Sequence, residues 1–383
     1  MMNEKENIVS TILPHTKLKK LGTDRFVGYC PFCRADTPTF FVSWKKQSFH
    51  CFNCGKSGDE KKFISLIDMK EEKEEMDASV SKLLWATTAF FTRSLSKSEG
   101  KKGLQYLKSR GLSEETIDKF ALGYACKGSA LIRFLKKKGY SEQELLDFGL
   151  AKKNDKEECY DSFRNRVMFP ILNESGDVIG FGGRVLDDSK PKYLNSPESS
   201  VFIKKKNLFA LNLAKDSKKD FFILTEGYMD VIALHQAGFD NAVASLGTAL
   251  TEDQAKLIAR YVNTVVIAYD SDDAGRRATR RAIEILNKVG LKVKILTLPE
   301  GSKDPDELMQ TPAGVQLFQR CIETAEDSIL YLLRQNRKKY DSSNEKELKS
   351  FLKESSELLL NAHPVSQIIY AKVAVELWRS REH

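Results

Sequence analysis

Short apolar runs alternate with helical patterns between residues 221 and 298. The apolar runs include FFILT, AVASLG, TVVIAY and VKILTL, and the stretches between them include YMDVIALHQAG, TEDQAKLIARY and AGRRATRRAIEILNKVG. This alternation is typical of βαβ units in a parallel, doubly wound sheet. We therefore expect an α/β subdomain over residues 220–310.

The patterns on either side of this region differ from it. Residues 81–150 have helical periodicity broken by glycines, and strand-like segments follow at 166–171, 178–184 and 192–194. Beyond about Ala313 only long helical patterns occur. A charged, apolar-poor stretch that begins at Asp68 indicates a linker behind a small β-rich module. The predicted boundaries are 1–69 for this module, 70–80 for a charged linker, 81–219 for an N-terminal subdomain of the core, 220–310 for the parallel sheet and 311–383 for a helical subdomain.

The amino-terminal module contains a closely spaced cysteine set, CPFC and CFNC, with 17 residues between the two pairs. This spacing predicts one structural zinc ion held by four thiolates. The alternatives are two disulfides, buried thiols, or His50 in place of one cysteine. The predicted zinc ligands are Cys30, Cys33, Cys51 and Cys54.

Between the cysteine pairs, TPTFFVSWKKQSFH predicts a strand, a turn and a second strand. Its aromatic residues have two interpretations. They can form the core of a small metal domain, or Trp44, followed by Lys45 and Lys46, can stack on unpaired bases while the lysines neutralise phosphates. We expect Trp44 to contact nucleic acid.

Composition narrows the class of protein. The chain has 383 residues, 41% of them hydrophobic, and a net charge of +8. This hydrophobic content is too high for a disordered chain, and a mean hydropathy of −0.39 argues against a membrane-spanning protein. The amino terminus, MMNEKENIVS, has no apolar signal core, so we expect a cytoplasmic protein. The positive charge favours an anionic partner.

Acidic residues follow three of the predicted parallel strands. Ligands of such sheets bind outside the carboxyl ends of the strands, so these side chains should converge there. Clustered carboxylates repel one another unless divalent cations neutralise them, and oxygen ligands favour Mg²⁺ or Mn²⁺. The predicted metal-binding acids are Glu226, Asp230, Asp270, Asp272, Asp304 and Asp306.

Acidic residues also cap helices, and this is the role that we assign to Asp273. On the basic side, Arg184 follows a glycine pair and Lys192 lies on a short strand, so both can project onto the face beside the acids. Arg110, Arg164 and Arg166 are further candidates for this basic surface. The alternative for each is an ordinary solvated position.

Together these segments resemble bacterial-type DNA primase, the DnaG family, over nearly the whole chain. The segments that carry the resemblance include YLKSRGL, RNRVMFPI, IGFGGRV, PKYLNSPES, LTEGYMDVIALHQAGF, ASLGTALTEDQ, AYDSDDAG and KDPDEL. EGYMD and DSDDAG are similar to the Toprim signature, which topoisomerases and some nucleases also contain. The pair GFGGRV and PKYLNSP is more specific to the primase family than the Toprim signature is.

The resemblance implies a fold class, a multidomain α/β protein with a zinc ribbon, an RNA polymerase core containing a Toprim sheet, and a helical subdomain. It implies synthesis of short RNA primers from ribonucleoside triphosphates on a single-stranded DNA template, with two Mg²⁺ ions. Glu226, Asp270 and Asp272 would be the central catalytic acids. Arg110, Arg184 and Lys192 would contact template and nucleotide.

Three departures from the family pattern and two alternative functions accompany this interpretation. Cys33 replaces a histidine that is common in the family, Ser271 replaces a common glycine, and the chain ends at His383, soon after AKVAVELW, without the usual helicase-binding domain. We therefore do not expect direct helicase docking through that domain. The alternative functions are a Toprim-type nuclease and a non-catalytic zinc protein that binds single strands.

Overall fold

The structure is a computed structural model that describes residues 8–32, 37–52, 55–71, 77–247, 249–341, 344–360 and 364–379. Contacts within the backbone divide the chain into two units, Met1–Met76 and Asp77–His383. The predicted linker at 70–80 overlaps the helices at both of its ends, α2 (Glu60–Glu71) and α3 (Ala78–Leu95). None of the described helices is long and apolar enough to cross a membrane.

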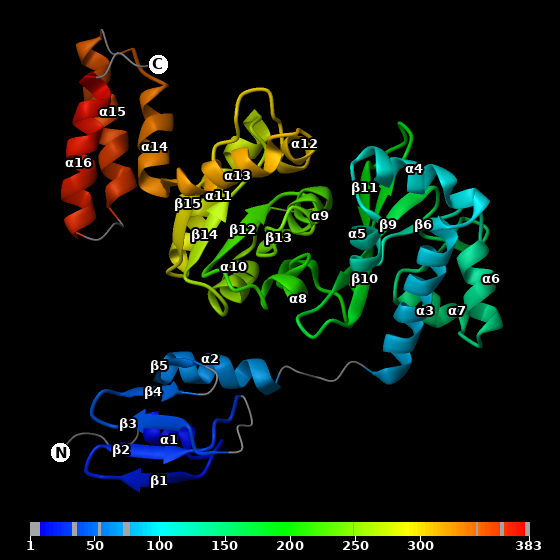
Figure 1. Ribbon diagram of the computed structural model, residues 1–383, viewed down its shortest axis with the longest axis horizontal. Helices are drawn as coiled ribbons and strands as arrows, with labels where there is room; N and C mark the ends of the chain where they lie inside the picture. The colour runs from blue at the N-terminus through cyan, green and yellow to red at the C-terminus, as the bar shows by residue number, and fades with distance from the viewer. Residues whose placement is uncertain are drawn as a thin grey trace. The chain divides into compact units, whose positions relative to one another are not determined.

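The N-terminal unit is an antiparallel sheet in which each strand pairs with the next along the chain (Figure 1). Phe40 and Val42 of β3 point into the core and Phe41 and Ser43 point outward, as expected for a sheet with one solvated face. Phe40 and Phe49 pack there against Phe63 of α2. The predicted strand, turn and strand are thus confirmed. The elements are α1 (Ile8–Ile12), β1 (Leu18–Leu21), β2 (Arg25–Gly28), β3 (Phe40–Ser43), β4 (Ser48–Cys51), β5 (Ser57–Asp59) and α2.

The second unit begins with a subdomain built on an antiparallel sheet of order β11-β10-β9-β6. The three predicted strands occur as β9, β10 and β11. β6 is a short strand in the stretch for which the sequence predicted mainly helices, and it pairs with β9. Further elements of this antiparallel-sheet subdomain are α3, η1 (Ser98–Gly100), α4 (Lys101–Ser109), α5 (Glu114–Lys119), β6 (Gly123–Ala125), α6 (Ala130–Lys137), α7 (Glu142–Asp147), β7 (Ala151–Lys153), β8 (Cys159–Asp161), β9 (Arg166–Leu172), β10 (Val178–Val185), β11 (Tyr193–Asn195), η2 (Lys204–Lys206) and α8 (Leu211–Ala214).

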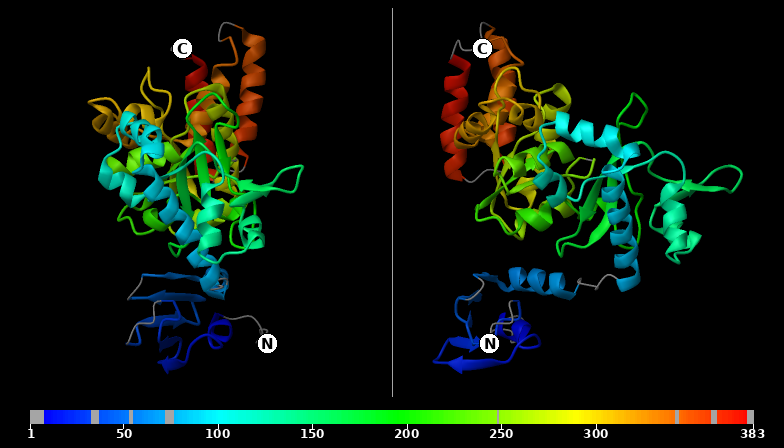
Figure 2. Two further views of the ribbon diagram at one scale, coloured as in Figure 1. Left: turned by 90° about the vertical axis from the view of Figure 1, so that its right-hand side faces the viewer. Right: turned by 45° about the vertical axis from the view of Figure 1, so that its right-hand side comes forward.

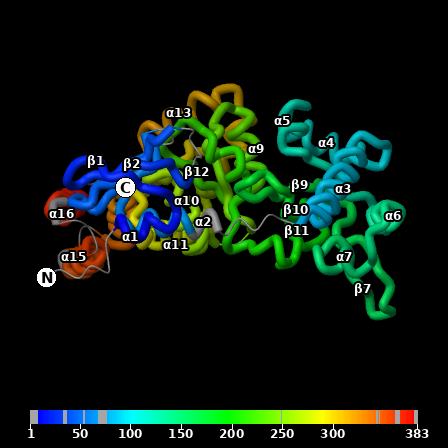
Figure 3. The backbone as a smooth tube through the Cα atoms, turned by 90° about the horizontal axis from the view of Figure 1, so that it is seen from below, coloured from blue at the N-terminus to red at the C-terminus, as the bar shows by residue number. Residues whose placement is uncertain are grey.

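The parallel-sheet subdomain has the strand order β13-β12-β14-β15, with the short strand β16 added antiparallel at one edge. β16 lies where only helices were expected. Right-handed crossovers place α9 on one face of this sheet and α10 and α11 on the other (Figure 3). The elements are β12 (Phe221–Thr225), α9 (Tyr228–Gln236), β13 (Ala242–Ala244), α10 (Glu252–Ala259), β14 (Thr264–Ile267), α11 (Asp273–Lys288), β15 (Lys292–Ile295), α12 (Pro305–Met309), α13 (Gly314–Glu323) and β16 (Glu326–Asp327).

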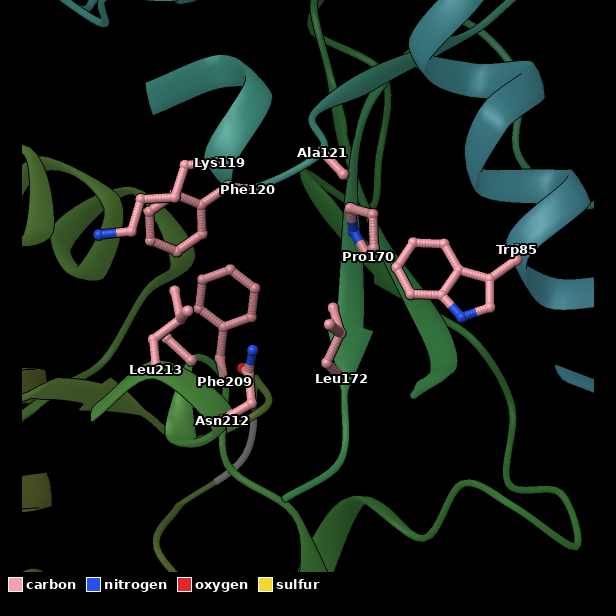
Figure 4. A pocket seen from close by; sticks show the side chains of 10 residues that line it. Trp85, Lys119, Phe120, Ala121, Pro170, Leu172, Phe209, Asn212 and Leu213 are labelled. Carbon is pink, nitrogen blue, oxygen red and sulfur yellow. The ribbon is translucent and has the colours of Figure 1, made fainter. Parts of the chain in front are cut away.

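The two sheets of this unit meet across α9. Tyr228 of α9 stacks on Phe169 of β9, with ring centroids 5.2 Å apart. A Cβ at Gly182 of β10 would lie 2.7 Å from the Tyr228 ring, so only glycine allows this approach. Figure 4 shows a small cavity next to this junction, between Trp85 of α3 and the pair Phe120 and Phe209.

The chain ends in a helical subdomain made of α14 (Ser328–Arg337), α15 (Glu345–Leu359) and α16 (Pro364–Arg379) (Figure 2). Leu333, Phe351 and Ala374 form its core. The Trp378 ring stacks on the Phe351 ring at 5.5 Å. A helical subdomain is present, but it begins at α14 rather than at residue 311, because β16 pairs with β15 of the parallel sheet. α14 connects it to the edge of that sheet.

Candidate active site

The first acidic pair lies at the ends of two adjacent parallel strands. Glu226 follows β12 and Asp270 follows β14, and the backbone N–H of Asp270 donates to Oε1 of Glu226 at 3.3 Å. Burial raises the pKa of Glu226, and the Asp270 charge raises it further. Burial also raises the pKa of Asp270, with a further contribution from Asp304. The structure therefore brings these predicted site residues together at one edge of the sheet.

Asp230 lies deeper than the other acids. It belongs to α9 and is only 6% exposed. Its carboxylate accepts the backbone N–H of Gly227 at 3.0 Å and that of Asp306 at 3.2 Å. Burial, followed by the Asp304 and Asp270 charges, raises the pKa of Asp230 well above its usual range. Asp230 thus braces two of the loops that carry acids.

Two of the predicted ligands are helix caps in this structure. Asp272 accepts the backbone N–H of Gly275 at 2.9 Å and is the N-cap of α11. Asp304 accepts the N–H of Glu307 at 2.8 Å and caps α12. The expectation that Asp273 is the cap is wrong, because the helix begins at Asp273 itself, whose carboxylate pairs with Arg276.

Asp306 forms an ion pair with Arg110, a contact between the two sheet subdomains. Its carboxylate is almost fully buried, and Gln310 of the same helix also donates to it at 3.5 Å. The ion pair joins two residues that the sequence placed in different groups, the metal-binding acids and the basic surface. In this arrangement Asp306 fixes the position of Arg110.

Lys303 is a site residue that the sequence analysis missed. Its Nζ atom lies 3.8 Å from Asp270 and 3.6 Å from Asp272. Within the described residues, no three acidic, histidine or cysteine side chains form a ready ligand set for a metal. The reason is that several of these carboxylates already have other partners. Asp272 caps α11, Asp306 pairs with Arg110, and Lys303 lies beside Asp270 and Asp272. The sequence signal that could have identified Lys303 is its position in the loop directly before Asp304.

The acids nevertheless fit a divalent cation. All donors are carboxylate oxygens, which Mg²⁺ and Mn²⁺ prefer. The pKa values of Glu226, Asp230 and Asp270 are all raised, because burial and mutual repulsion disfavour their charged forms. A bound cation would relieve this repulsion. We call the six acids at this edge the carboxylate row.

A group of basic and aromatic side chains faces the carboxylate row from the antiparallel-sheet subdomain. The Arg184 guanidinium lies over the Tyr106 ring at 4.2 Å and over the Tyr193 ring at 6.0 Å. The Lys192 charge acts on Asp270 and opposes the rise of its pKa. We call this group the cationic corner; its members are Arg110, Arg184, Lys192, Tyr106 and Tyr193.

The guanidinium groups of the cationic corner retain unused donors. The Nε atoms of Arg110 and Arg184 are buried without a hydrogen-bond partner among the described residues. Tyr106 also forms a side-chain hydrogen bond with the Arg184 guanidinium, which helps to hold that group in place. Tyr106 and Tyr193 were not predicted, although Tyr193 is adjacent to Lys192 in the sequence.

Two other arginines considered as part of the basic surface lie elsewhere. Arg166 is buried and donates to the carbonyl oxygens of Gly183 at 3.1 Å and Lys192 at 3.3 Å, so it supports the sheet. Arg164 lies over the Tyr160 ring at 4.7 Å. The expectation that Arg166 joins the exposed basic surface is wrong, because its donors bind the backbone.

Half of the predicted zinc ligands can be described. Cys30 and Cys51 are buried, and the N–H of Phe32 donates to Sγ of Cys30 at 3.4 Å. Such N–H to sulfur bonds are typical of thiolates that bind a metal. Cys33 and Cys54 lie outside the described residues. Trp44 is in the turn after β3 and is 52% exposed.

Comparisons with known proteins agree with this architecture. Residues 1–93 match the CHC2 zinc finger, residues 90–215 the N-terminal domain of the DNA primase catalytic core, and residues 223–309 a Toprim-like domain. A DNA primase of Aquifex aeolicus is 39% identical over 84% of this chain and 70% of its own length. A DNA primase of Clostridium acetobutylicum is 41% identical over 96% of this chain, which covers 65% of that relative.

Solved structures show the same similarity. The zinc-binding and RNA polymerase domains of the Aquifex aeolicus primase cover 99% of this chain with a TM-score of 0.67 and 34% identity; the match spans 98% of that structure. A DnaG primase catalytic domain bound to single-stranded DNA covers 78% of it with a TM-score of 0.68 and 35% identity, over 97% of that structure. The chain belongs to the DnaG family of DNA primases. The predicted fold class is confirmed.

Proposed function

We propose that this protein synthesises short RNA primers from ribonucleoside triphosphates on a single-stranded DNA template. The observation that carries the proposal is that the carboxylate row and the cationic corner belong to one compact unit and face each other, with Lys192 acting on Asp270. Carboxylates that can hold divalent cations, opposite guanidinium groups with unused donors, suit the transfer of a nucleotide from its triphosphate.

The residues of this chain have separate tasks in such a reaction. Glu226, Asp270 and Asp272 would hold Mg²⁺ or Mn²⁺, with Asp230, Asp304 and Asp306 in support. The bound cations would neutralise the phosphates and activate the attacking hydroxyl. Arg184, fixed between Tyr106 and Tyr193, would bind a phosphate through its in-plane donors. The ion pair with Asp306 would position Arg110 beside the template and nucleotide.

The N-terminal unit would supply a template contact and a structural zinc site. Cys30, Cys33, Cys51 and Cys54 would bind one Zn²⁺. Trp44 is exposed at the turn between two strands, with Lys45 and Lys46 next to it, which suits stacking on an unpaired base beside neutralised phosphates.

Primer synthesis on single-stranded DNA tests the proposal. The assay uses labelled ribonucleotides with Mg²⁺ or Mn²⁺ and compares the intact chain with Asp270→Asn, which keeps the size of the side chain and removes its charge. We expect template-dependent short RNA from the wild type and a loss of at least about a thousandfold in the variant. An unchanged circular dichroism spectrum would show that the variant is folded.

A Toprim-type nuclease is the competing function. Cleavage of DNA in the presence of Mg²⁺ without any incorporation of nucleotide would replace the primase proposal with this one. Tight binding of single strands with neither activity would instead support a non-catalytic binding protein.

A further inference from the structure

A cavity of about 310 Å³ lies next to Glu226 in the parallel-sheet subdomain. Its walls come from the ends of β12 and β14, from the segment between β13 and α10, and from α11. We call it the α11 cavity. The residues that matter here are Glu226, Ser245, Leu250, Tyr269, Ala278 and Arg281.

The topology of the sheet places this cavity and the cationic corner on opposite sides of the carboxylate row. α9 packs against β9, as the Tyr228–Phe169 contact shows, so the antiparallel sheet lies on the α9 face, although η2 of the same subdomain contacts α10 on the other face. α11 covers the other face, because the crossover from β14 to β15 runs in the opposite direction to that from β12 to β13. Glu226, at the end of β12, lies between the two.

The segment that forms one wall of the cavity is tied to the other side of the site. The side-chain amide of Asn195, from β11, donates to the carbonyl oxygen of Leu246 at 2.8 Å. The hydroxyl of Tyr228 donates to Oδ1 of Asn195 at 2.7 Å. These two bonds hold Leu246 in a fixed position, and its neighbour Ser245 lines the cavity together with Glu226.

The lining of the α11 cavity suits a nucleotide. Leu250, Tyr269 and Ala278 give apolar walls that can take a base, and the cavity volume lies at the lower end of the range for small-molecule sites, about 300–1,000 Å³. Arg281 is exposed at the cavity and can reach a phosphate. Ser245 is buried and offers a hydroxyl beside them.

Nucleotide transfer needs two nucleotides on opposite sides of the metal-binding acids, one that attacks and one that is attacked. We propose that the α11 cavity binds the nucleotide whose 3′ hydroxyl attacks, and that Arg281 contacts its phosphate. The triphosphate of the incoming nucleotide then lies in the cationic corner. This inference rests on the proposed primase function.

The chemical step follows from this placement. The 3′ oxygen forms a bond to the α-phosphorus as the bond from that phosphorus to the pyrophosphate oxygen breaks. The hydroxyl proton passes to solvent, and pyrophosphate leaves on the side of the cationic corner. The product is extended by one nucleotide, and its new 3′ end must move into the α11 cavity before the next addition.

Kinetics of the first bond formation test the inference. A template whose first two coded nucleotides differ allows the KM of the initiating and of the incoming ribonucleotide to be measured separately. For Arg281→Gln in the full chain we expect the KM of the initiating nucleotide to rise about tenfold, since a charge-assisted contact is lost. The KM of the incoming nucleotide and kcat should stay within about twofold.

A matched control is available on the same helix. The charge of Arg280 acts on Tyr331 and Glu354, so this side chain faces the helical subdomain. Arg280→Gln removes the same charge and should change neither KM. Ala249→Phe, which fills the cavity from an exposed position, should act like Arg281→Gln.

Binding without added Mg²⁺ or Mn²⁺ gives a second readout that leaves the zinc site loaded. In such a buffer, equilibrium dialysis of guanosine 5′-monophosphate should show weaker binding to Arg281→Gln than to the wild type and Arg280→Gln. Equal changes in both KM values, or none in either, would overturn the cavity assignment while leaving the primase function standing. Absence of any RNA product from the wild type would instead remove the proposed function on which the assignment rests.

Discussion

The sheet of the N-terminal unit and the parallel sheet of the core present their side chains in different ways. In the first, one face is open, so alternate residues such as Phe41 and His50 point outward along the strands. In the second, helices cover both faces and every residue of β12 except the first is buried. Along β12 and β14, functional groups can therefore reach solvent only where the strands end, which is where Glu226 and Asp270 lie.

The same difference sets what each sheet depends on for stability. The core of the N-terminal unit is a small cluster built around Phe40, Phe49 and Phe63, with Cys30 and Cys51 within it. The core of the parallel sheet is a larger cluster shared by α10, α11 and the strands. Small units of the first kind commonly need a metal, and large apolar cores do not.

Removal of zinc should produce the largest difference in stability between the two sheets. We expect Cys51→Ser or strong chelation to unfold the N-terminal unit, since structural zinc supplies about 10 kcal/mol of folding free energy in zinc-finger peptides. The core should stay folded. Limited proteolysis should then yield a resistant fragment that begins near Asp77, and loss of the whole chain to protease would contradict the comparison.

Acid should test the claim that both faces of the parallel sheet are covered. His235 of α9 is buried against Phe120, and burial lowers its pKa from 6.5 to about 4. Between these values the unfolded chain binds more protons than the folded one, so the stability contribution of neutral His235 is present above pH 6.5 and is lost as the pH falls. The loss should amount to about 3 kcal/mol at pH 4.

The variant His235→Gln isolates this contribution, because glutamine can still donate to the Ala242 carbonyl, which lies 2.9 Å from Nε2 of His235. Urea unfolding at several pH values should show a shallower acid dependence for the variant. If the unfolding free energy of the variant and of the wild type depends on pH with the same slope, His235 is not buried between α9 and the residues packed on it.

Substitution in the cationic corner should have a smaller effect. Arg184→Lys keeps the charge but loses the planar guanidinium that lies between Tyr106 and Tyr193. We expect the KM of the incoming nucleotide to rise about tenfold with little change in unfolding free energy. Arg164→Lys, at an arginine that contacts Tyr160 instead, is the matched control. Equal effects of the two would argue against a special role for this corner.

The smallest effect is expected on the open face of the N-terminal unit. Trp44 is 52% exposed, so Trp44→Ala should leave the zinc content and fold intact. Loss of one stacked base should weaken binding of single-stranded DNA about fivefold in a fluorescence anisotropy titration. Unchanged affinity would assign Trp44 to an ordinary surface position.

The sequence alone determined the order of elements and the positions of the main acids. Buried apolar runs and helical periodicity are local properties, so FFILT and TVVIAY predicted β12 and β14, and Glu226 and Asp270 then had to follow at the same edge. The cysteine spacing likewise predicted a zinc module, which the family comparison supports. Short strands such as β6 and β16 were missed, because their pairing partners lie far away in the sequence.

Only the tertiary structure decided which side chains meet across subdomains. Several features join residues that are distant in sequence or in separate elements. They are the pairing of Asp306 with Arg110, the placement of Arg184 between two tyrosines, the position of Lys303 and the α11 cavity. The cap of α11 is Asp272 rather than Asp273 because the first helical turn begins one residue earlier than the pattern indicated. Such contacts depend on how the packed sheets and helices are oriented, and periodicity carries no information about that orientation.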